Sequence, residues 1–170
     1  MKRKGKSGFL LTAISCAVLV VLCACTNYAE KKKIDGVIRT YNKALEGAFG
    51  TMDFEPFKKI TTEKEYNKVS VYIMSYAGQG ETLSAHLVKL EIKRIEVEGS
   101  GATAYTSEQW EYERKSTETG EVLRPKTLYL YEMKYSLIKD KDAWKVDRLK
   151  IEKETVNGKL DKLSRNVENN

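Results

Sequence analysis

Cysteine is confined to the start of this 170-residue chain, at Cys16, Cys23 and Cys25. The sequence that follows therefore contains no disulfide framework and no thiolate metal site. Histidine occurs only as His86, and zinc sites usually take three or four protein ligands, so we expect no metal centre. A glycine-rich phosphate loop and a serine–histidine–aspartate order are also missing. These absences argue against a hydrolase, and we predict no catalytic residues and no cofactor.

The part of the chain from Cys25 onward also has almost no excess of basic over acidic residues. The chain has 30 Lys and Arg residues against 24 Asp and Glu, but four of the basic residues and none of the acidic ones precede Cys25, which leaves 26 against 24. Domains that bind nucleic acid show a basic footprint. We therefore expect no nucleic-acid partner.

The one long apolar run lies near the N-terminus, over residues 9–22, behind a basic start. This order is typical of a secretory signal, and the run is shorter than the roughly 20 residues that span a bilayer. Leu22-Cys23-Ala24-Cys25 at its end resembles the lipobox of bacterial lipoproteins, in which the last cysteine is diacylated and becomes the new N-terminus. The resemblance implies a signal peptide over residues 1–24 and lipidation of Cys25.

Two acyl chains such as palmitate would hold the protein stably on a membrane, since each buried methylene contributes about 0.8 kcal/mol. We therefore predict a membrane partner through lipidated Cys25, with residues 25–33 as the lipidated cysteine and a tether. The expected location is the exported side of the cell membrane or outer membrane. An uncleaved N-terminal anchor is the alternative, and it leaves the domain on the same side.

Two amphipathic helices are predicted after the tether. Apolar residues recur every three or four positions from Ile34 to Phe49, which indicates one buried helix face. A short segment over residues 54–60 carries a proline near its start. Thr62 and Glu65 then form a capping-box pattern that begins the second helix.

After Gly80 the apolar period changes to alternation, which predicts strands. A phase change at Lys93-Arg94 predicts a β-bulge or strong bend in the first strand. Residues 115–125 are polar and are interpreted as a long hairpin loop. The first predicted strand carries its apolar residues from Val88 to Val97, and the next three strands cover residues 102–114, 127–139 and 143–151.

Residues 152–170 are predicted to be a polar tail, in which Leu160, Leu163 and Val167 could form a short surface helix. The rest is one domain over residues 34–151. Helices followed by strands indicate an α+β domain, with the N-terminal helices packed on a bent four-stranded antiparallel sheet.

This order and several motifs resemble the nuclear transport factor 2-like superfamily, also called cystatin-like, in which a bent sheet wraps a long N-terminal helix to make a cone. Within it, the most similar group is the IMS domain of plastid-division proteins and their bacterial relatives. The resemblance covers residues 34–151. The motifs that carry it are residues 41–46 with Phe49, residues 52–57, 97–99, 110–112, 119–122 and 144–147.

The superfamily contains isomerases and dehydratases as well as binding and scaffolding domains, so the fold leaves the function to be argued from the site. Its enzymes place Asp, His and Tyr inside the cone. His86 begins the alternation of Val88, Leu90 and Ile92, which allows a position facing the interior near the mouth. A lone histidine at a strand start is more often a polar edge residue, and this is the interpretation we favour. Asp147 lies inside the last strand, where pairing with a cross-strand Lys or Arg is expected.

Aromatic residues are concentrated in the predicted strands, and core and cross-strand packing is expected to explain most of them. An interface for a protein partner and a pocket for an apolar ligand are the alternatives. The charged residues among them, over residues 108–114, are expected to form a solvated face. The candidate ligand or partner surface comprises His86, Trp110, Tyr112, Tyr129, Tyr131 and Tyr135.

These observations predict a non-enzymatic binding or assembly module whose partner is an envelope protein or a second copy of the chain. The alternative is a pocket that binds a small apolar ligand, or acts on it as an isomerase or dehydratase would. Exposed tyrosines would favour the first hypothesis. Inward-facing tyrosines around an unfilled cavity would favour the second.

Overall fold

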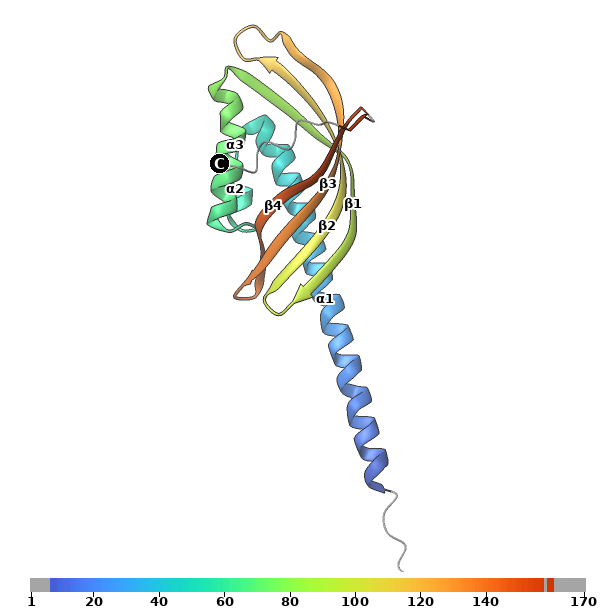
Figure 1. The fold of residues 1–170 in the computed structure, drawn as a ribbon. Helices are drawn as coiled ribbons and strands as arrows, with labels where there is room; N and C mark the ends of the chain where they lie inside the picture. Colours follow the sequence, from blue (N-terminus) through green and yellow to red (C-terminus); the bar gives the residue numbers. More distant parts are fainter. Residues whose placement is uncertain (1–6, 158, 161–170) are drawn as a thin grey trace, which may run out of the picture.

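The computed structural model describes residues 7–157 and 159–160, with side chains from residue 27 to residue 157. Helices precede strands, as predicted, and the strands form one antiparallel sheet in the order β1-β2-β3-β4-β5. The sheet is strongly bent, and α1 and α3 lie on its concave side (Figure 1). The elements are α1 (Ser7–Thr51), α2 (Glu55–Lys58), α3 (Glu63–Gly78), β1 (Glu81–Glu98), β2 (Gly101–Ser116), β3 (Val122–Asp140), β4 (Ala143–Val156) and β5 (Lys159–Leu160).

Helix α1 presents one apolar stripe to the sheet, where it packs mainly against β1. Ile34, Ile38 and Tyr41 are fully buried at spacings of four and three residues, and Ala48 and Phe49 continue the stripe. This spacing places the side chains on one face of a helix. The predicted first helix is therefore confirmed in its buried face.

The predicted start of that helix is wrong, because α1 already includes the segment interpreted as a tether. Glu30 holds this segment to the end of the sheet. Its Oε2 accepts hydrogen bonds from Trp144 Nε1 at 2.6 Å and Lys139 Nζ at 3.1 Å, and its Oε1 accepts one from Lys33 Nζ at 2.8 Å. Lys33, Trp144 and Lys139 together lower the pKa of Glu30 to about 2. Among the described residues, no helix is both long enough and apolar enough to cross a membrane.

The turn into α3 is attached to the edge of β4. Thr62 caps the helix, its Oγ1 accepting from the Glu65 N–H at 3.4 Å, as the capping-box pattern predicts. The Thr62 N–H donates to the Val146 carbonyl at 2.9 Å, and the Val146 N–H donates to the Ile60 carbonyl at 2.8 Å. The first turn of α3 is therefore fixed against the sheet.

Two irregularities bend β1. The register with β2 shifts between Ile92 and Arg94, which confirms the predicted bulge, and also between Leu87 and Lys89, which the sequence did not indicate. Each extra residue bends a strand and increases its twist. Glu46 of α1 supports the second irregularity, since its Oε1 accepts from the Leu87 N–H at 3.3 Å.

Two predicted boundaries, those of the hairpin loop and of the C-terminal tail, differ from the structure. Strands β2 and β3 run through most of residues 115–125, so the predicted long loop is a short turn between Ser116 and Val122. Pro125 is accommodated beside a register shift, where a strand tolerates a missing N–H donor. Strand β4 continues to Val156 and pairs with β5, so the predicted tail begins too early and Leu160 lies in a strand. Leu163 and Val167 lie outside the described residues.

We expect the replacement Glu30→Gln to release the N-terminal part of α1 from the sheet. The lowered pKa means that the contribution of Glu30 is complete above about pH 4.5 and is lost as the pH falls toward about 2. The indole N–H resonance of Trp144 should therefore titrate well below pH 4.5 in the wild type and not in the variant. Glu63→Gln, an exposed position, is the matched control. A midpoint near the ordinary glutamate value would contradict the contact.

Candidate functional site

The predicted aromatic residues face the concave side of the sheet, but His86 does not lie with them. Trp110, Tyr129 and Tyr135 are buried, and Tyr112 and Tyr131 are half-buried. These residues are thus mainly packing residues.

The His86 side chain is 67% exposed, with Nδ1 2.7 Å from Glu46 Oε1. The exposed position agrees with the interpretation of His86 as a polar edge residue and excludes the interior alternative. The irregularity at Val88 separates the phase of His86 from that of Leu90 and Ile92.

A buried carboxylate, Glu108, lies at the centre of the cone interior with an exposed fraction of 1%. Its Oε1 accepts from Tyr135 Oη at 2.6 Å and Thr106 Oγ1 at 2.8 Å, and its Oε2 accepts from Trp110 Nε1 at 2.9 Å. The expectation that residues 108–114 form a solvated face is therefore wrong for Glu108. A usable signal was present, because Glu108 shares the parity of Ala104, Thr106 and Trp110 along the strand.

Asn42 joins this network to helix α1. Its Nδ2 donates to Tyr135 Oη at 2.9 Å and to the Ile38 carbonyl at 3.1 Å, and lies 3.5 Å from Glu108 Oε1. Asn42 Oδ1 is buried and has no partner among the described residues. The network therefore crosses from α1 to β2 and β3 through side chains that are fully buried.

A second buried carboxyl, Glu65 of α3, lies beside Tyr41. Tyr41 Oη donates to Glu65 Oε1 at 2.9 Å, and Lys68 Nζ lies 4.0 Å from Oε2. Burial raises the pKa of Glu65, against the smaller effects of Lys68 and Tyr41. Burial also raises the pKa of Tyr41 and Tyr135 well above the usual value, so both phenols stay protonated and donate.

These two clusters are built to hold the helices and the sheet together. Tyr41, Asn42 and Tyr135 have no exposed surface, and a substrate could reach Glu108 only by displacing them. Asp147, which was expected to pair with Lys or Arg, forms no ion pair within the described residues. No group of three His, Cys, Asp or Glu residues gathers in the part of the chain that the structure describes.

Toward the open end of the cone, aromatic rings connect α1, α3 and the sheet. Phe49 lies edge-on to Tyr72, Tyr76 and Tyr112, with ring centroids 6.1, 6.5 and 6.0 Å away. Tyr112 in turn contacts Tyr129 at 5.4 Å. Such edge-on pairs stabilise a core beyond their buried area.

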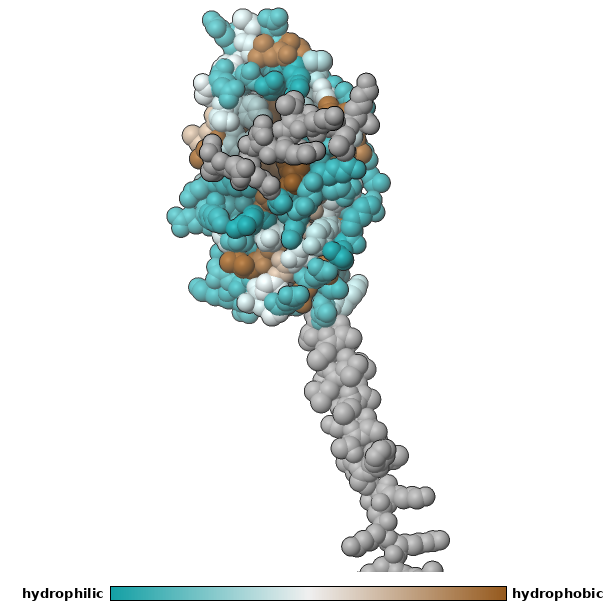
Figure 2. Space-filling view, in the orientation of Figure 1, coloured by the Kyte–Doolittle hydropathy of each residue, from teal (hydrophilic) through white to brown (hydrophobic). Residues whose placement is uncertain are grey.

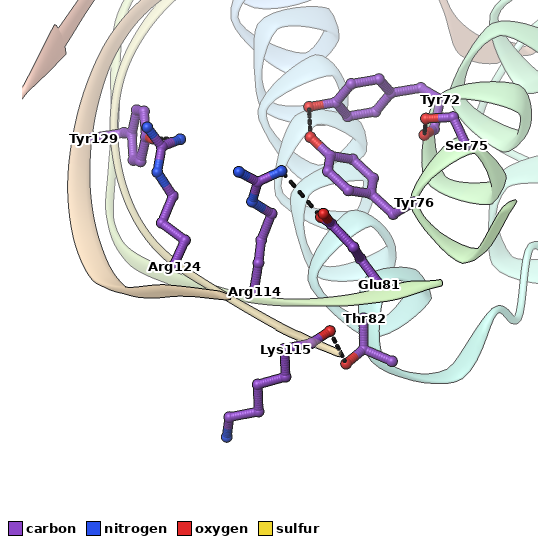
Figure 3. A network of polar contacts seen from close by, with 9 residues as sticks. All are labelled: Tyr72, Ser75, Tyr76, Glu81, Thr82, Arg114, Lys115, Arg124 and Tyr129. Atoms are coloured by element: carbon purple, nitrogen blue, oxygen red, sulfur yellow. Dashed lines mark hydrogen bonds and ion pairs between the residues drawn. The ribbon is translucent and has the colours of Figure 1, made fainter. Parts of the chain in front are cut away.

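A polar rim surrounds this end of the aromatic cluster (Figure 3). Arg114 Nη1 donates to Glu81 Oε2 at 3.0 Å, and Arg124 Nη1 donates to Tyr129 Oη at 2.7 Å. The hydroxyls of Tyr72 and Tyr76 lie 3.2 Å apart. Arg114, Arg124, Tyr72 and Tyr76 were not among the predicted site residues.

The visible surface is mostly hydrophilic, with small separate apolar areas (Figure 2). The exposed apolar side chains belong to several elements, including Val71 and Met74 on α3, Val122 and Leu123 on β3, and Ile151 on β4. An exposed aromatic patch of the kind that would mark a large partner surface is not seen on this face.

Glu108→Ala should lower the free energy of unfolding by about 3 kcal/mol or more, because each buried donor left without an acceptor costs roughly 1–3 kcal/mol. Tyr135, Thr106 and Trp110 would each lose their acceptor. Glu111→Ala, on the other parity of the same strand, should change it by about 0.5 kcal/mol or less. Chemical denaturation measures both. Equal, small effects would show that Glu108 is not essential to the interior.

Glu65→Gln keeps an acceptor for Tyr41 and removes the ionisation. Because the folded pKa is raised, the wild type loses stability as the pH rises from about 4.5 through the folded-state pKa. We expect the variant to unfold at a higher temperature than the wild type near neutral pH, and the difference to vanish in acid. Thermal unfolding across the pH range tests this. A difference that does not change with pH would contradict it.

Solved structures share this architecture at low sequence identity. The intermembrane space region of the chloroplast protein ARC6 is 15% identical, with a TM-score of 0.60 over 71% of this chain and 94% of that one. The Kfla4162 protein from Kribbella flavida is 8% identical, with a TM-score of 0.51 over 74% and 94%. An uncharacterized protein with a cystatin-like fold from Caulobacter vibrioides is 13% identical, with a TM-score of 0.43 over 71% and 88%.

No protein-family model and no curated protein matches the sequence. The similarity to solved structures is therefore a similarity of fold. The three helices, the bent antiparallel sheet and the ARC6 match agree with the motifs found in the sequence. The chain has the nuclear transport factor 2-like, or cystatin-like, cone fold, and it shares this fold with the ARC6 intermembrane space region.

Proposed function

We propose that this chain is a lipid-anchored binding or assembly module on the exported side of a cell envelope. The observation that carries the proposal is Leu22-Cys23-Ala24-Cys25, at the end of an apolar run and a basic start. Acylation at Cys25 would place the anchor a few residues before Glu30. Glu30 in turn joins α1 to Lys139 and Trp144 of the sheet.

The way α1 enters the domain supports this arrangement. The helix continues without interruption from Ser7 to Thr51, and its N-terminal half extends away from the sheet (Figure 1). A helix rises about 1.5 Å per residue, so residues 25–33 would act as a short, stiff spacer. The domain would then be held close to the membrane with its open end pointing away from it.

A binding role is supported by the way the interior is used. The side chains that could perform acid–base chemistry, Glu108, Tyr135 and Tyr41, are hydrogen-bonded to one another or to neighbours and sealed from solvent. Tyr112 and Tyr131 keep partial exposure, as does the rim beyond them. A protein partner or a second copy would meet these surfaces and His86.

The ARC6 structure bears on the proposed location. The ARC6 region belongs to a chloroplast protein and lies in an intermembrane space, which is an envelope compartment. An isomerase-like or ligand-binding pocket is the second hypothesis, and it requires the interior to open. A small-molecule adduct on the full chain in native mass spectrometry would favour that hypothesis, and a bare monomer or dimer would favour the module.

Lipidation is tested by metabolic labelling with palmitate in a bacterial host. We expect label on the wild type and on Cys23→Ser, and no label on Cys25→Ser, which should accumulate as the uncleaved precursor. Cys23→Ser is the matched control, because it removes a neighbouring thiol and keeps the small residue that the lipobox pattern requires. Partition of the wild type into the aqueous phase of a detergent extract, with Cys25 unmodified, would overturn the anchor.

A further inference from the structure

We propose that the open end of the cone binds a small oxyanion, a carboxylate or a phosphate, between Arg114 and Arg124. This inference rests on the proposed binding role and specifies a ligand class for it. It does not depend on the lipid anchor. The site is the polar rim defined by Glu81, Arg114, Arg124, Tyr72 and Tyr76 (Figure 3).

The two arginines are directly opposite each other on neighbouring strands, Arg114 on β2 and Arg124 on β3. Like charges in this position destabilise a sheet. The register shifts on both sides of Arg114, between Tyr112 and Arg114 and again before Lys115. Irregularities of this kind re-aim side chains. Figure 3 shows the Arg114 guanidinium directed to Glu81 and the Arg124 guanidinium beside the Tyr129 ring.

At the rim, the N–H groups of the two arginines outnumber the hydrogen-bond acceptors that the described residues offer them. Glu81 is the one carboxylate there that pairs with either arginine, at 3.0 Å from Arg114. Arg124 donates to the neutral hydroxyl of Tyr129 and forms no ion pair within residues 27–157. Arg114 Nε is buried and has no acceptor in the same range. Buried polar groups are nearly always hydrogen-bonded, so an acceptor is missing at this point.

The tyrosines of α3 add donors on the opposite side. Tyr72 Oη and Tyr76 Oη form one hydrogen bond with each other, which leaves one of the two O–H groups to donate elsewhere. Tyr72 is 53% exposed as a residue, and the partial burial of its hydroxyl, with Tyr76 and Glu154 nearby, raises its pKa, so the hydroxyl stays neutral. Glu154 faces the same concave side, but it pairs in register with Tyr131, further along β3 from Arg124.

The ligand chemistry follows from these donors. Guanidinium groups match the two oxygens of a carboxylate or phosphate in a bidentate arrangement. Glu81 pairs with Arg114, and Glu154 adds negative charge near Tyr72, so the ligand would meet the charge of Arg124 and the Nε–H of Arg114, which suits a monoanion. The rim lies at the end of the domain opposite the N-terminal half of α1 (Figure 1), so an anchored protein would meet a soluble anion there.

The test uses the full chain in a non-ionic detergent, labelled with ¹⁵N-arginine. Sodium phosphate and sodium acetate are titrated separately, with sodium chloride holding the ionic strength constant. We expect the Nε–H resonances of Arg114 and Arg124 to shift saturably with at least one of them. Arg124→Gln should weaken the apparent affinity by roughly tenfold or more, because it removes a charge-assisted hydrogen bond.

Two further variants make the result specific. Arg148→Gln removes an exposed arginine of β4 and should leave the affinity unchanged. Tyr76→Phe keeps the ring, removes the hydroxyl and should weaken binding by a smaller factor. This variant still tests the site if Arg124→Gln does not fold. A shift that appears with phosphatidylglycerol vesicles and with neither salt would keep the oxyanion chemistry and assign it to a lipid headgroup.

The proposal is overturned if neither salt nor vesicles produce a saturable shift, or if Arg124→Gln and Arg148→Gln bind alike. Its failure is distinguishable from failure of the anchor. Palmitate on Cys25 with no anion binding would leave an envelope protein without this site. Anion binding with no palmitate would leave the site on a protein that is attached in another way.

Discussion

Glu108 is the buried polar group on which the interior depends. It is a carboxylate with no cation beside it among the described residues, and neutral donors from Tyr135, Thr106, Trp110 and Asn42 surround it. A buried charge is costly unless it is hydrogen-bonded on every side. These donors come from α1, β2 and β3, so the network forms only when the sheet has wrapped the helix. It therefore stabilises the wrapped arrangement over other packings of the same apolar surfaces.

The bend that permits this wrapping originates in β1. An extra residue near Val88 and another at Lys93 turn the strand so that apolar residues before, between and after them, such as Leu83, Leu90 and Ile95, pack against the core. Glu46 of α1 binds the backbone at the first of these points. Helix and sheet thus stabilise each other's geometry. The same bend carries His86 to the outside, and this removes the one histidine from any interior chemistry.

Charged groups have different surroundings in the interior and at the rim. Inside, both carboxyls have hydrogen-bond donors, and the aromatic rings fill the space around them. At the rim, Arg114 and Arg124 face each other on adjacent strands, and only one carboxylate, Glu81, pairs with them in the described structure. Like charges directly opposite each other on adjacent strands destabilise a sheet unless something else offsets them. The closed interior and the unbalanced rim together favour binding at the end of the cone over chemistry within it.

The sequence by itself determined what depends on near neighbours along the chain. The stripe from Ile34 to Phe49, the Thr62 cap and the order of helices and strands all follow from local periodicity and capping, and the structure contains them. The resemblance of residues 22–25 to a lipobox is likewise a local pattern, and lipidation of Cys25 stays a prediction. The resemblance in short motifs also led to the correct fold, because that fold is set by the order of its elements.

Only the tertiary structure decided which side chains meet across strands. The register of β2 with β3 brings Arg114 opposite Arg124, and neither position shows this in its own segment. One unpredicted irregularity sets His86 out of phase with Leu90 and Ile92, because a shift of one residue moves a strand's side chains to the other face. Glu108 lies on the inward parity of its strand, but the donors that make its burial possible come from distant segments, and only the tertiary structure brings them to it.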